Sequence, residues 1–251
     1  MFIRYLRQLS DQQRSQRADR HLGYSLAFVA GAVNAGGFLA IGQYTSHMTG
    51  IISGMADHLA LGDFIPAMAG LTAWLSFAAG AASTALLINL ARRRHLRSQY
   101  ALSLLLEAAL LLLFGVTGAY LGEMHEFLAP VTVLLLCFIM GLQNAIITKV
   151  SSATIRTTHM TGLSTDLGIE LGKLLYYNRR DLPELTVRAN RSKLALHALL
   201  ILHFFAGGVT GALGFKHIGY ASTIPLALGL AVLAMGPIIA DLRRRARRRT
   251  H

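Results

Sequence analysis

The chain has 251 residues, of which 53% are hydrophobic and only 14% are charged, and its formal net charge is +12. This composition supplies too little polar surface to cover a soluble globule of this size, which argues against a soluble all-α domain. The basic excess would suit nucleic acid, but the positions of the basic residues point to a membrane instead, so we expect no nucleic-acid partner.

Six apolar stretches are each long enough for the hydrocarbon core of a bilayer, which takes about 20 helical residues. We therefore predict an all-α membrane protein with six transmembrane helices. The single cysteine, Cys137, lies inside the fourth stretch and can form no disulfide within the chain. The predicted spans cover approximately residues 22–41, 64–90, 100–121, 129–148, 194–215 and 221–240.

The Lys and Arg residues indicate the orientation of these spans. If the spans alternate and the N-terminus is cytoplasmic, all of the 24 Lys and Arg residues except Lys216 lie on the cytoplasmic side. Cytoplasmic loops of membrane proteins are enriched in these two residues. The sequence thus predicts cytoplasmic termini, a surrounding lipid bilayer and anionic lipid headgroups near the basic loops.

A tetrapeptide, His-Met-Thr-Gly, occurs twice, at residues 47–50 and 159–162. Each copy follows an apolar stretch that contains an asparagine, Asn34 in the first and Asn144 in the second. Farther along, Phe-Ala-Ala-Gly at 77–80 corresponds to Phe-Ala-Gly-Gly at 205–208. Three matches in the same order indicate a duplicated unit of three spans, and an odd number of spans inverts the second unit relative to the first.

The segments after the two motifs, residues 48–61 and 160–175, are short and contain charged residues. If both crossed the bilayer, several basic residues would move to the outside, against the observed bias. We therefore predict that each is a short re-entrant or interfacial helix. In transporters built from inverted repeats, broken helices of the two halves meet near the middle of the membrane and line the substrate site.

The expected organisation follows from these assignments. A basic cytoplasmic N-terminus covers residues 1–21, and the first membrane repeat covers 22–122. The second repeat covers 129–240 and contains a polar cytoplasmic loop, 176–193. A basic cytoplasmic tail covers 241–251.

The motif sequences resemble those of the YoaK-type family of bacterial multi-pass membrane proteins. They are GAVNAGGF at 31–38, QYTSHMTG at 43–50, GLQNA at 141–145 and TTHMTGLSTDLGIELG at 157–172. The resemblance covers about residues 20–240 and implies a six-helix protein of the bacterial inner membrane, with a transporter-like role and no settled substrate. In many members of that family the first motif is similar to Thr-Gly-Asn, whereas in this chain Ile51 follows Gly50.

Polar side chains of the repeated motifs, together with Gln143 beside Asn144, are the candidate substrate-binding residues, because a polar group in hydrocarbon is costly unless it is bonded. Thr49 and Thr161 are predicted to cap the short helices, whose free N–H groups attract anions; caps that only satisfy the backbone are the alternative. Asn34 and Asn144 are expected to bond the motif loops or neighbouring helices. The candidates are Asn34, Thr45, Ser46, His47, Thr49, Gln143, Asn144, Thr158, His159 and Thr161.

Three carboxylates are candidates for proton coupling. Glu107 stands alone among leucines in the third span, where a carboxylate is a functional candidate unless it reaches headgroup water. Asp166 and Glu170 share one helical face, with Lys173 placed to pair with Glu170, so a solvated cytoplasmic face is the alternative for these two.

No nucleophile elbow, phosphate-binding loop or His-Glu-x-x-His motif occurs, so we expect neither enzyme activity nor a cofactor. The spacing of His47, His58 and the nearby carboxylates does not predict a metal site of about four ligands. The leading hypothesis is a transporter or permease for an unknown small solute, with its site between the repeats. The alternative is a non-transporting scaffold or partner-binding protein. Gly207 and Gly211 form a small-residue face for packing within the chain or in a homodimer.

Overall fold

The computed structural model describes residues 16–94, 96, 98–178 and 186–249, and these residues form helices and loops without a strand. Parts of three predicted basic or polar segments lie outside the described residues. They are 1–15 of the N-terminal segment, 179–185 of the polar loop and 250–251 of the tail.

The described helices, in chain order, are α2 (Gln16–Ile41), α3 (Met48–Leu61), α4 (Phe64–Arg93), α5 (Ala101–Ala119), α6 (His125–Val150), α7 (Met160–Leu175), α8 (Arg191–His217), a 3₁₀ turn η2 (Gly219–Ser222) and α9 (Thr223–Arg249). Six of them, α2, α4, α5, α6, α8 and α9, supply stretches long and apolar enough to cross a membrane. The prediction of an all-α membrane protein with six long apolar helices is confirmed. Their bounds agree with the predicted spans to within a few residues, except that α9 continues through the basic tail.

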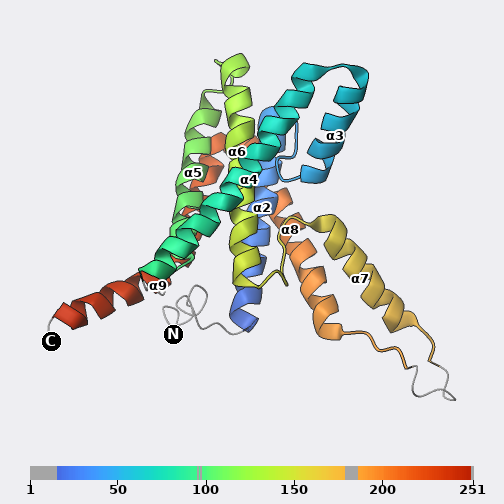
Figure 1. The fold of residues 1–251 in the computed structure, drawn as a ribbon, viewed down its shortest axis with the longest axis vertical. Helices are drawn as coiled ribbons and strands as arrows, with labels where there is room; N and C mark the ends of the chain where they lie inside the picture. Colours follow the sequence, from blue (N-terminus) through green and yellow to red (C-terminus); the bar gives the residue numbers. More distant parts are fainter. Residues whose placement is uncertain (1–15, 95, 97, 179–185, 250–251) are drawn as a thin grey trace.

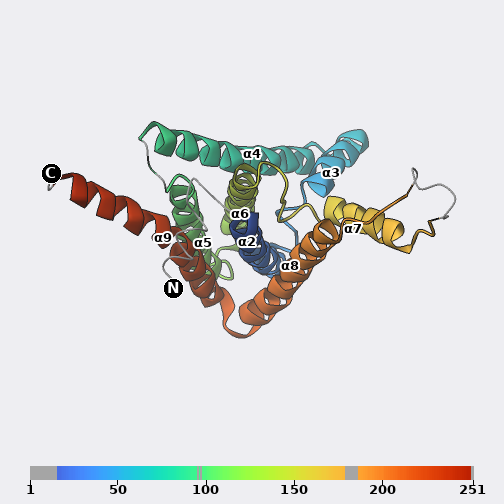
Figure 2. The same cartoon turned by 90° about the horizontal axis from the view of Figure 1, so that it is seen from below.

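The helices pack around α2 and α6, which lie together in the middle of the bundle (Figures 1 and 2). Helix α8 runs along α2, α4 runs along α6, and α5 packs against both α6 and α9. Side chains such as Leu104, Phe114 and Leu142 are completely buried between them. The outer faces expose large apolar side chains such as Leu86 and Leu202, as expected of helices that face lipid.

Two glycines allow α2 and α8 to cross in backbone contact. A Cβ on Gly31 would lie 2.0 Å from the carbonyl oxygen of Phe204. Reciprocally, a Cβ on Gly207 would lie 1.9 Å from the carbonyl oxygen of Phe28. Each helix therefore places a Phe-x-x-Gly segment against the same kind of segment on the other, and no side chain fits between them.

Helices α4 and α6 cross in the same way. A Cβ on Gly80 would lie 2.0 Å from the carbonyl oxygen of Phe138, and one on Gly141 would lie 1.9 Å from that of Phe77. The two crossings use the same residue types at the same spacing. The helices of the two crossings also correspond to each other in the predicted repeat, in which α6 is the counterpart of α2 and α8 is the counterpart of α4.

The predicted correspondence of residues 77–80 with 205–208 is wrong by one position. In the structure, Phe204 and Gly207 make the contacts that Phe77 and Gly80 make in the other crossing. The alignment of the two sequences is ambiguous because α8 has two adjacent phenylalanines and two adjacent glycines. Packing resolves the ambiguity, since Gly207 faces α2 while Phe205 is 66% exposed.

The small-residue face of α8 packs within the chain. Like Gly207, Gly211 faces α2, where a Cβ would lie 2.5 Å from the Cα atom of Ala32. This finding resolves the two alternatives for these glycines in favour of packing between helices of the same molecule.

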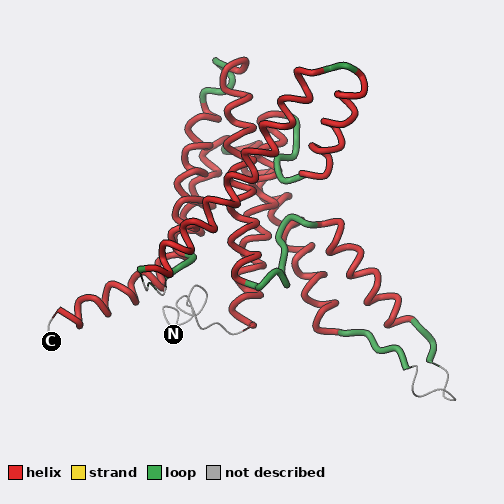
Figure 3. Tube along the Cα trace, viewed as in Figure 1, coloured by secondary structure: helices red, strands yellow, loops and turns green. Residues whose placement is uncertain are grey.

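Helices α3 and α7 occupy opposite halves of the bundle. The loops that follow α2 and α6 double back to mid-height, where the two short helices begin (Figure 3). From there α3 runs to one end and packs on α4, while α7 runs to the other end and packs on α8 (Figure 1). Both short helices therefore start at mid-height and run to opposite ends of the bundle, and we call them the half-helices (Figures 1 and 3).

Candidate functional site

The two half-helices begin directly after the histidines of the motifs. His47 is the N-cap residue of α3 and His159 that of α7, and neither helix has a side-chain capping hydrogen bond. The predicted capping role of Thr49 and Thr161 is therefore wrong. Both threonines lie inside the first turn, two residues past the N-cap position, where their hydroxyls cannot act as N-cap acceptors.

The histidine of each motif explains the glycine three residues later. A Cβ on Gly50 would lie 2.2 Å from the Cδ2 atom of His47, and one on Gly162 would lie 2.1 Å from the Nδ1 atom of His159. Each imidazole ring thus folds over the first turn of its own helix. An alanine there would require the ring to move aside, and both histidine side chains are exposed.

Each asparagine holds its own motif loop. The Ser46 hydroxyl donates a hydrogen bond to Asn34 Oδ1 at 3.0 Å, and the Thr158 hydroxyl donates one to Asn144 Oδ1 at 2.8 Å. The predicted pairing between these asparagines and the motif loops is present in both halves. It anchors the start of each half-helix to α2 or α6.

Residues from both motifs line one cavity of about 680 Å³, here called the motif cavity. Its polar lining includes Asn34 of α2, Ser46 and His47 of the first motif segment, and Thr158 and Thr161 of the second. Most of the rest of its wall consists of apolar residues of α2 and α8, with Tyr44 of the loop and Met160 and Ser164 of α7. The volume falls within the range of about 300–1,000 Å³ that is typical of small-molecule sites.

The other half of the predicted binding set lies outside this cavity. Thr45 is buried and its hydroxyl has no hydrogen-bond partner among the residues that the structure describes, whereas Thr49 is exposed. Gln143 and Asn144 are turned to other partners, and His159 does not contribute to the lining. The motif cavity is thus unequal in its use of the two copies, since it takes Thr161 but not Thr49.

Glu107 forms a buried pair with Gln143. The Gln143 Nε2 donates to Glu107 Oε1 at 2.7 Å, and both side chains have no solvent exposure. The alternative in which Glu107 reaches water at the headgroups is therefore wrong. Within the described part of the chain, Glu107 Oε2 and Gln143 Oε1 have no hydrogen-bond partner. A single neutral donor is poor compensation for a buried charge, so the pair fits a protonated Glu107 best.

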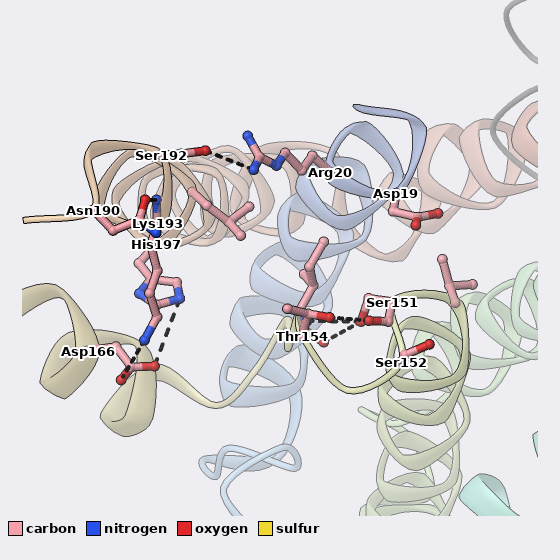
Figure 4. Close-up of a pocket in the computed structure, with 13 residues that line it drawn as sticks. Asp19, Arg20, Ser151, Ser152, Thr154, Asp166, Asn190, Ser192, Lys193 and His197 are labelled. Carbon is pink, nitrogen blue, oxygen red and sulfur yellow. Dashed lines mark hydrogen bonds and ion pairs between the residues drawn. The ribbon is translucent and has the colours of Figure 1, made fainter. Parts of the chain in front are cut away.

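A second pocket, of about 710 Å³, lies among one end each of α2, α6 and α8 and the side of α7 (Figure 4). We call it the polar pocket. Asp166 lies 3.6 Å from Lys193 Nζ and 3.9 Å from His197 Nε2, and Arg20 donates to Ser192 at 2.9 Å. The sequence analysis missed His197, although its position four residues after Lys193 in α8 places both on one helical face.

Glu170 connects α7 to the start of α8. It is only 3% exposed and accepts hydrogen bonds from the main-chain N–H of Asn190 at 2.7 Å and from Lys173 Nζ at 3.0 Å. The predicted pair with Lys173 is confirmed, whereas a solvated position is wrong for Glu170. The Asn190 N–H first, and then Lys173, favour the charged form and hold the pKa of Glu170 below its ordinary value.

This pKa shift predicts a loss of stability in acid. Because the folded-state pKa is the lower one, the stabilisation is complete above the ordinary pKa of about 4.3 and is lost as pH falls through the folded-state pKa. Glu170→Gln is therefore expected to lower the melting temperature at pH 7, with a difference from wild type that shrinks in acid. Thermal unfolding across pH measures this. Glu123→Gln, at an exposed site, is the control, and a gap that widens in acid would contradict the assignment.

Among the described residues, no three His, Cys, Asp or Glu side chains gather as metal ligands would. The polar pocket comes nearest in composition, but its Asp166 is engaged by Lys193 and His197. We therefore base no functional argument on a metal.

Comparison with known protein families supplies a classification. Residues 22–236 match the model of a family described as "Protein of unknown function (DUF1275)". The chain belongs to this family. The match is consistent with the YoaK-type resemblance of the motif sequences, and the matched residues include both copies of the His-Met-Thr-Gly motif. Curated proteins give no match, and neither do solved structures, so membership in the DUF1275 family brings no activity with it and the function must be argued from the geometry.

Proposed function

We propose that this protein is a transporter or permease for a small solute, and that the motif cavity is its substrate site. The observation that carries the proposal is that one cavity takes polar side chains from both copies of the motif. These side chains lie at the starts of two half-helices that run to opposite ends of the bundle. Transporters built from inverted repeats form their sites from broken helices in this way.

An inverted repeat is part of the proposal and has three structural supports. The α2–α8 and α4–α6 crossings use the same Phe-x-x-Gly contacts. Both asparagines bind the hydroxyl two residues before the start of their half-helix. Finally, α3 and α7 point to opposite ends (Figure 1). A two-fold axis in the membrane plane accounts for all three.

A third pocket supports a route to the cavity. It has a volume of about 870 Å³, lies beside α3, and shares Phe38, Tyr44 and His47 with the motif cavity. It is also the counterpart of the polar pocket in the proposed repeat. Ala129 and Pro130 of α6 line it, and they occupy the positions that correspond to Asp19 and Arg20 of α2, which line the polar pocket. The motif cavity and the polar pocket have no described lining residue in common. We therefore propose that the cavity is reached from the α3 side and that the polar pocket lies on the exit route.

Proton coupling is assigned to Glu107 in this proposal, with Asp166 of the polar pocket as a second carrier. Glu107 is the one carboxyl group among the described residues of the six candidate spans that is completely buried. A buried carboxyl group with spare acceptor sites can exchange a proton when the helices around it move. Glu170 is given a positioning role, because its bonds to Asn190 and Lys173 fix α7 against α8.

The proposed location is the bacterial inner membrane, with both termini in the cytoplasm. The start of α2 and the ends of α4, α7 and α9 lie toward the same end of the bundle (Figure 1). In a Cys137→Ala background, a cysteine at Arg93 is expected to react with an impermeant maleimide only from the cytoplasm, and one at Glu123 only from outside. Both positions are exposed. Reaction of position 93 from outside would contradict this topology.

The transport proposal predicts alternating access to Thr161. A Thr161→Cys variant in the same background is expected to react with the maleimide from outside in intact cells and from inside in inverted vesicles. Ser103→Cys, at a completely buried site, is the control and should react from neither side. A residue 161 that is never reached, or is reached from one side alone, would favour the alternative of a non-transporting scaffold or partner-binding protein.

A further inference from the structure

We infer that the motif cavity binds an organic monocarboxylate, with the carboxylate held at Asn34 and the start of α7 and an apolar body against α8. This inference names the substrate class of the proposed function and rests on it for its role in transport. The binding itself is a separate property that can be measured without transport. Three features of the cavity lead to it.

The first feature is a free donor on Asn34. Its Oδ1 accepts from Ser46, but among the described residues its Nδ2 has no hydrogen-bond partner. Asn34 is only 9% exposed and lines the cavity. Asn144 in the second half differs, because its Nδ2 donates to the Met140 carbonyl oxygen at 2.8 Å. The unused amide hydrogens thus belong to a side chain that lines the cavity, where a ligand acceptor would satisfy them.

The second feature is the uncapped start of α7. Met160 and Thr161 of its first turn line the cavity, as does Ser164 one turn later. Among the described residues no side chain caps this helix, and the Met160 N–H already donates to the Thr158 carbonyl oxygen at 2.9 Å. The next N–H groups, of Thr161 and Gly162, and the positive end of the helix dipole remain available to an anion. Together with Asn34 these groups form a set of donors without a competing acceptor of full charge.

The third feature is the absence of formal charge. The described residues that line the cavity include no Asp, Glu, Lys or Arg. A cationic solute would meet no compensating carboxylate here, and a multivalent anion such as phosphate would meet no Arg or Lys. One negative charge is what an amide and a helix start can balance. The remaining wall is apolar and includes the stacked pair Phe38 and Tyr44, whose ring centroids lie 4.8 Å apart, and Phe204. This wall suits an aliphatic or aromatic body.

Calorimetric titration of the purified full chain with benzoate tests the inference. Benzoate is expected to bind and to raise the melting temperature, whereas benzamide and benzylamine, of the same shape without the negative charge, bind at least about tenfold more weakly. Asn34→Asp removes the donors and adds a like charge, so it should weaken benzoate binding by about tenfold or more. Asn89→Asp is the matched comparison, because Asn89 is exposed on α4 and does not line the cavity, and it should change binding less than about threefold.

Several outcomes separate this inference from the proposed function. Equal binding of benzoate and benzamide to wild type would overturn the inference without any variant, even if Asn34→Asp failed to fold. Titration with palmitate distinguishes a lipid-derived carboxylate from a water-soluble one, since preference for palmitate assigns the cavity to a fatty acid. If no carboxylate binds but position 161 is labelled from both sides, the inference is wrong and the protein is a transporter of another solute. If carboxylates bind but position 161 is labelled from one side only, the inference holds, the transport proposal fails, and the protein is a receptor-like binding protein.

Discussion

Replacing Gly141 with alanine is expected to lower the free energy of unfolding by about 1–3 kcal/mol, the usual range for forcing extra atoms into a packed core. The added Cβ would lie 1.9 Å from the Phe77 carbonyl oxygen. That oxygen belongs to the backbone of α4, so it cannot rotate away as a side chain would. The two helices must separate along their length, and thermal unfolding of the purified protein in detergent measures the loss.

Gly229→Ala is the matched control for this prediction. Gly229 lies in α9, another candidate span, and a Cβ there would meet nothing within 4 Å. Alanine is a better helix former than glycine, so this change should be neutral or slightly stabilising. If both variants unfolded at the wild-type temperature, the α4–α6 crossing would be looser than the structure has it.

Replacing Gln143 with leucine is expected to cost about 1–3 kcal/mol, the usual penalty for leaving a buried polar group without its partner. The change removes the hydrogen-bond donor that Glu107 has in this structure, while the side-chain volume stays similar. Glu107→Gln should be far milder if the carboxyl group is neutral at rest. The new amide can still accept from Gln143 and can also donate to its unpaired Oε1. Chemical unfolding of both variants at one pH measures the difference.

The same pair of variants tests proton coupling. In a Thr161→Cys background, the rate of labelling from outside is expected to depend on pH when Glu107 is present, because its proton biases the helices around it. Glu107→Gln should remove that dependence. Because the thiol reaction itself depends on pH, the labelling rates of the two proteins are compared at each pH. An unchanged pH profile in Glu107→Gln would assign the carboxyl group a purely structural role.

Some properties of the site were predictable because the duplication marks them. A buried asparagine needs a partner, and the loop that follows it in the chain is the nearest candidate, so Asn34 and Asn144 could be assigned to their motif loops in advance. The duplication also misled in two places. It suggested capping by Thr49 and Thr161, whereas the N-cap residues are the histidines two positions earlier. It also treated the two threonines as equivalent, whereas only Thr161 lines the motif cavity.

The sequence by itself determined what depends on the polarity of each segment: the six long apolar helices, their all-α class and the two short helices after the motifs. Transfer into a membrane is decided segment by segment, so length and composition suffice. Only the tertiary structure decided which of Phe204 and Phe205 meets α2, that Glu170 is buried against Asn190, and that Asp166 meets His197. These depend on contacts between residues far apart in the chain, and contacts within an apolar bundle depend on shape and hydrogen bonding, which hydropathy does not record.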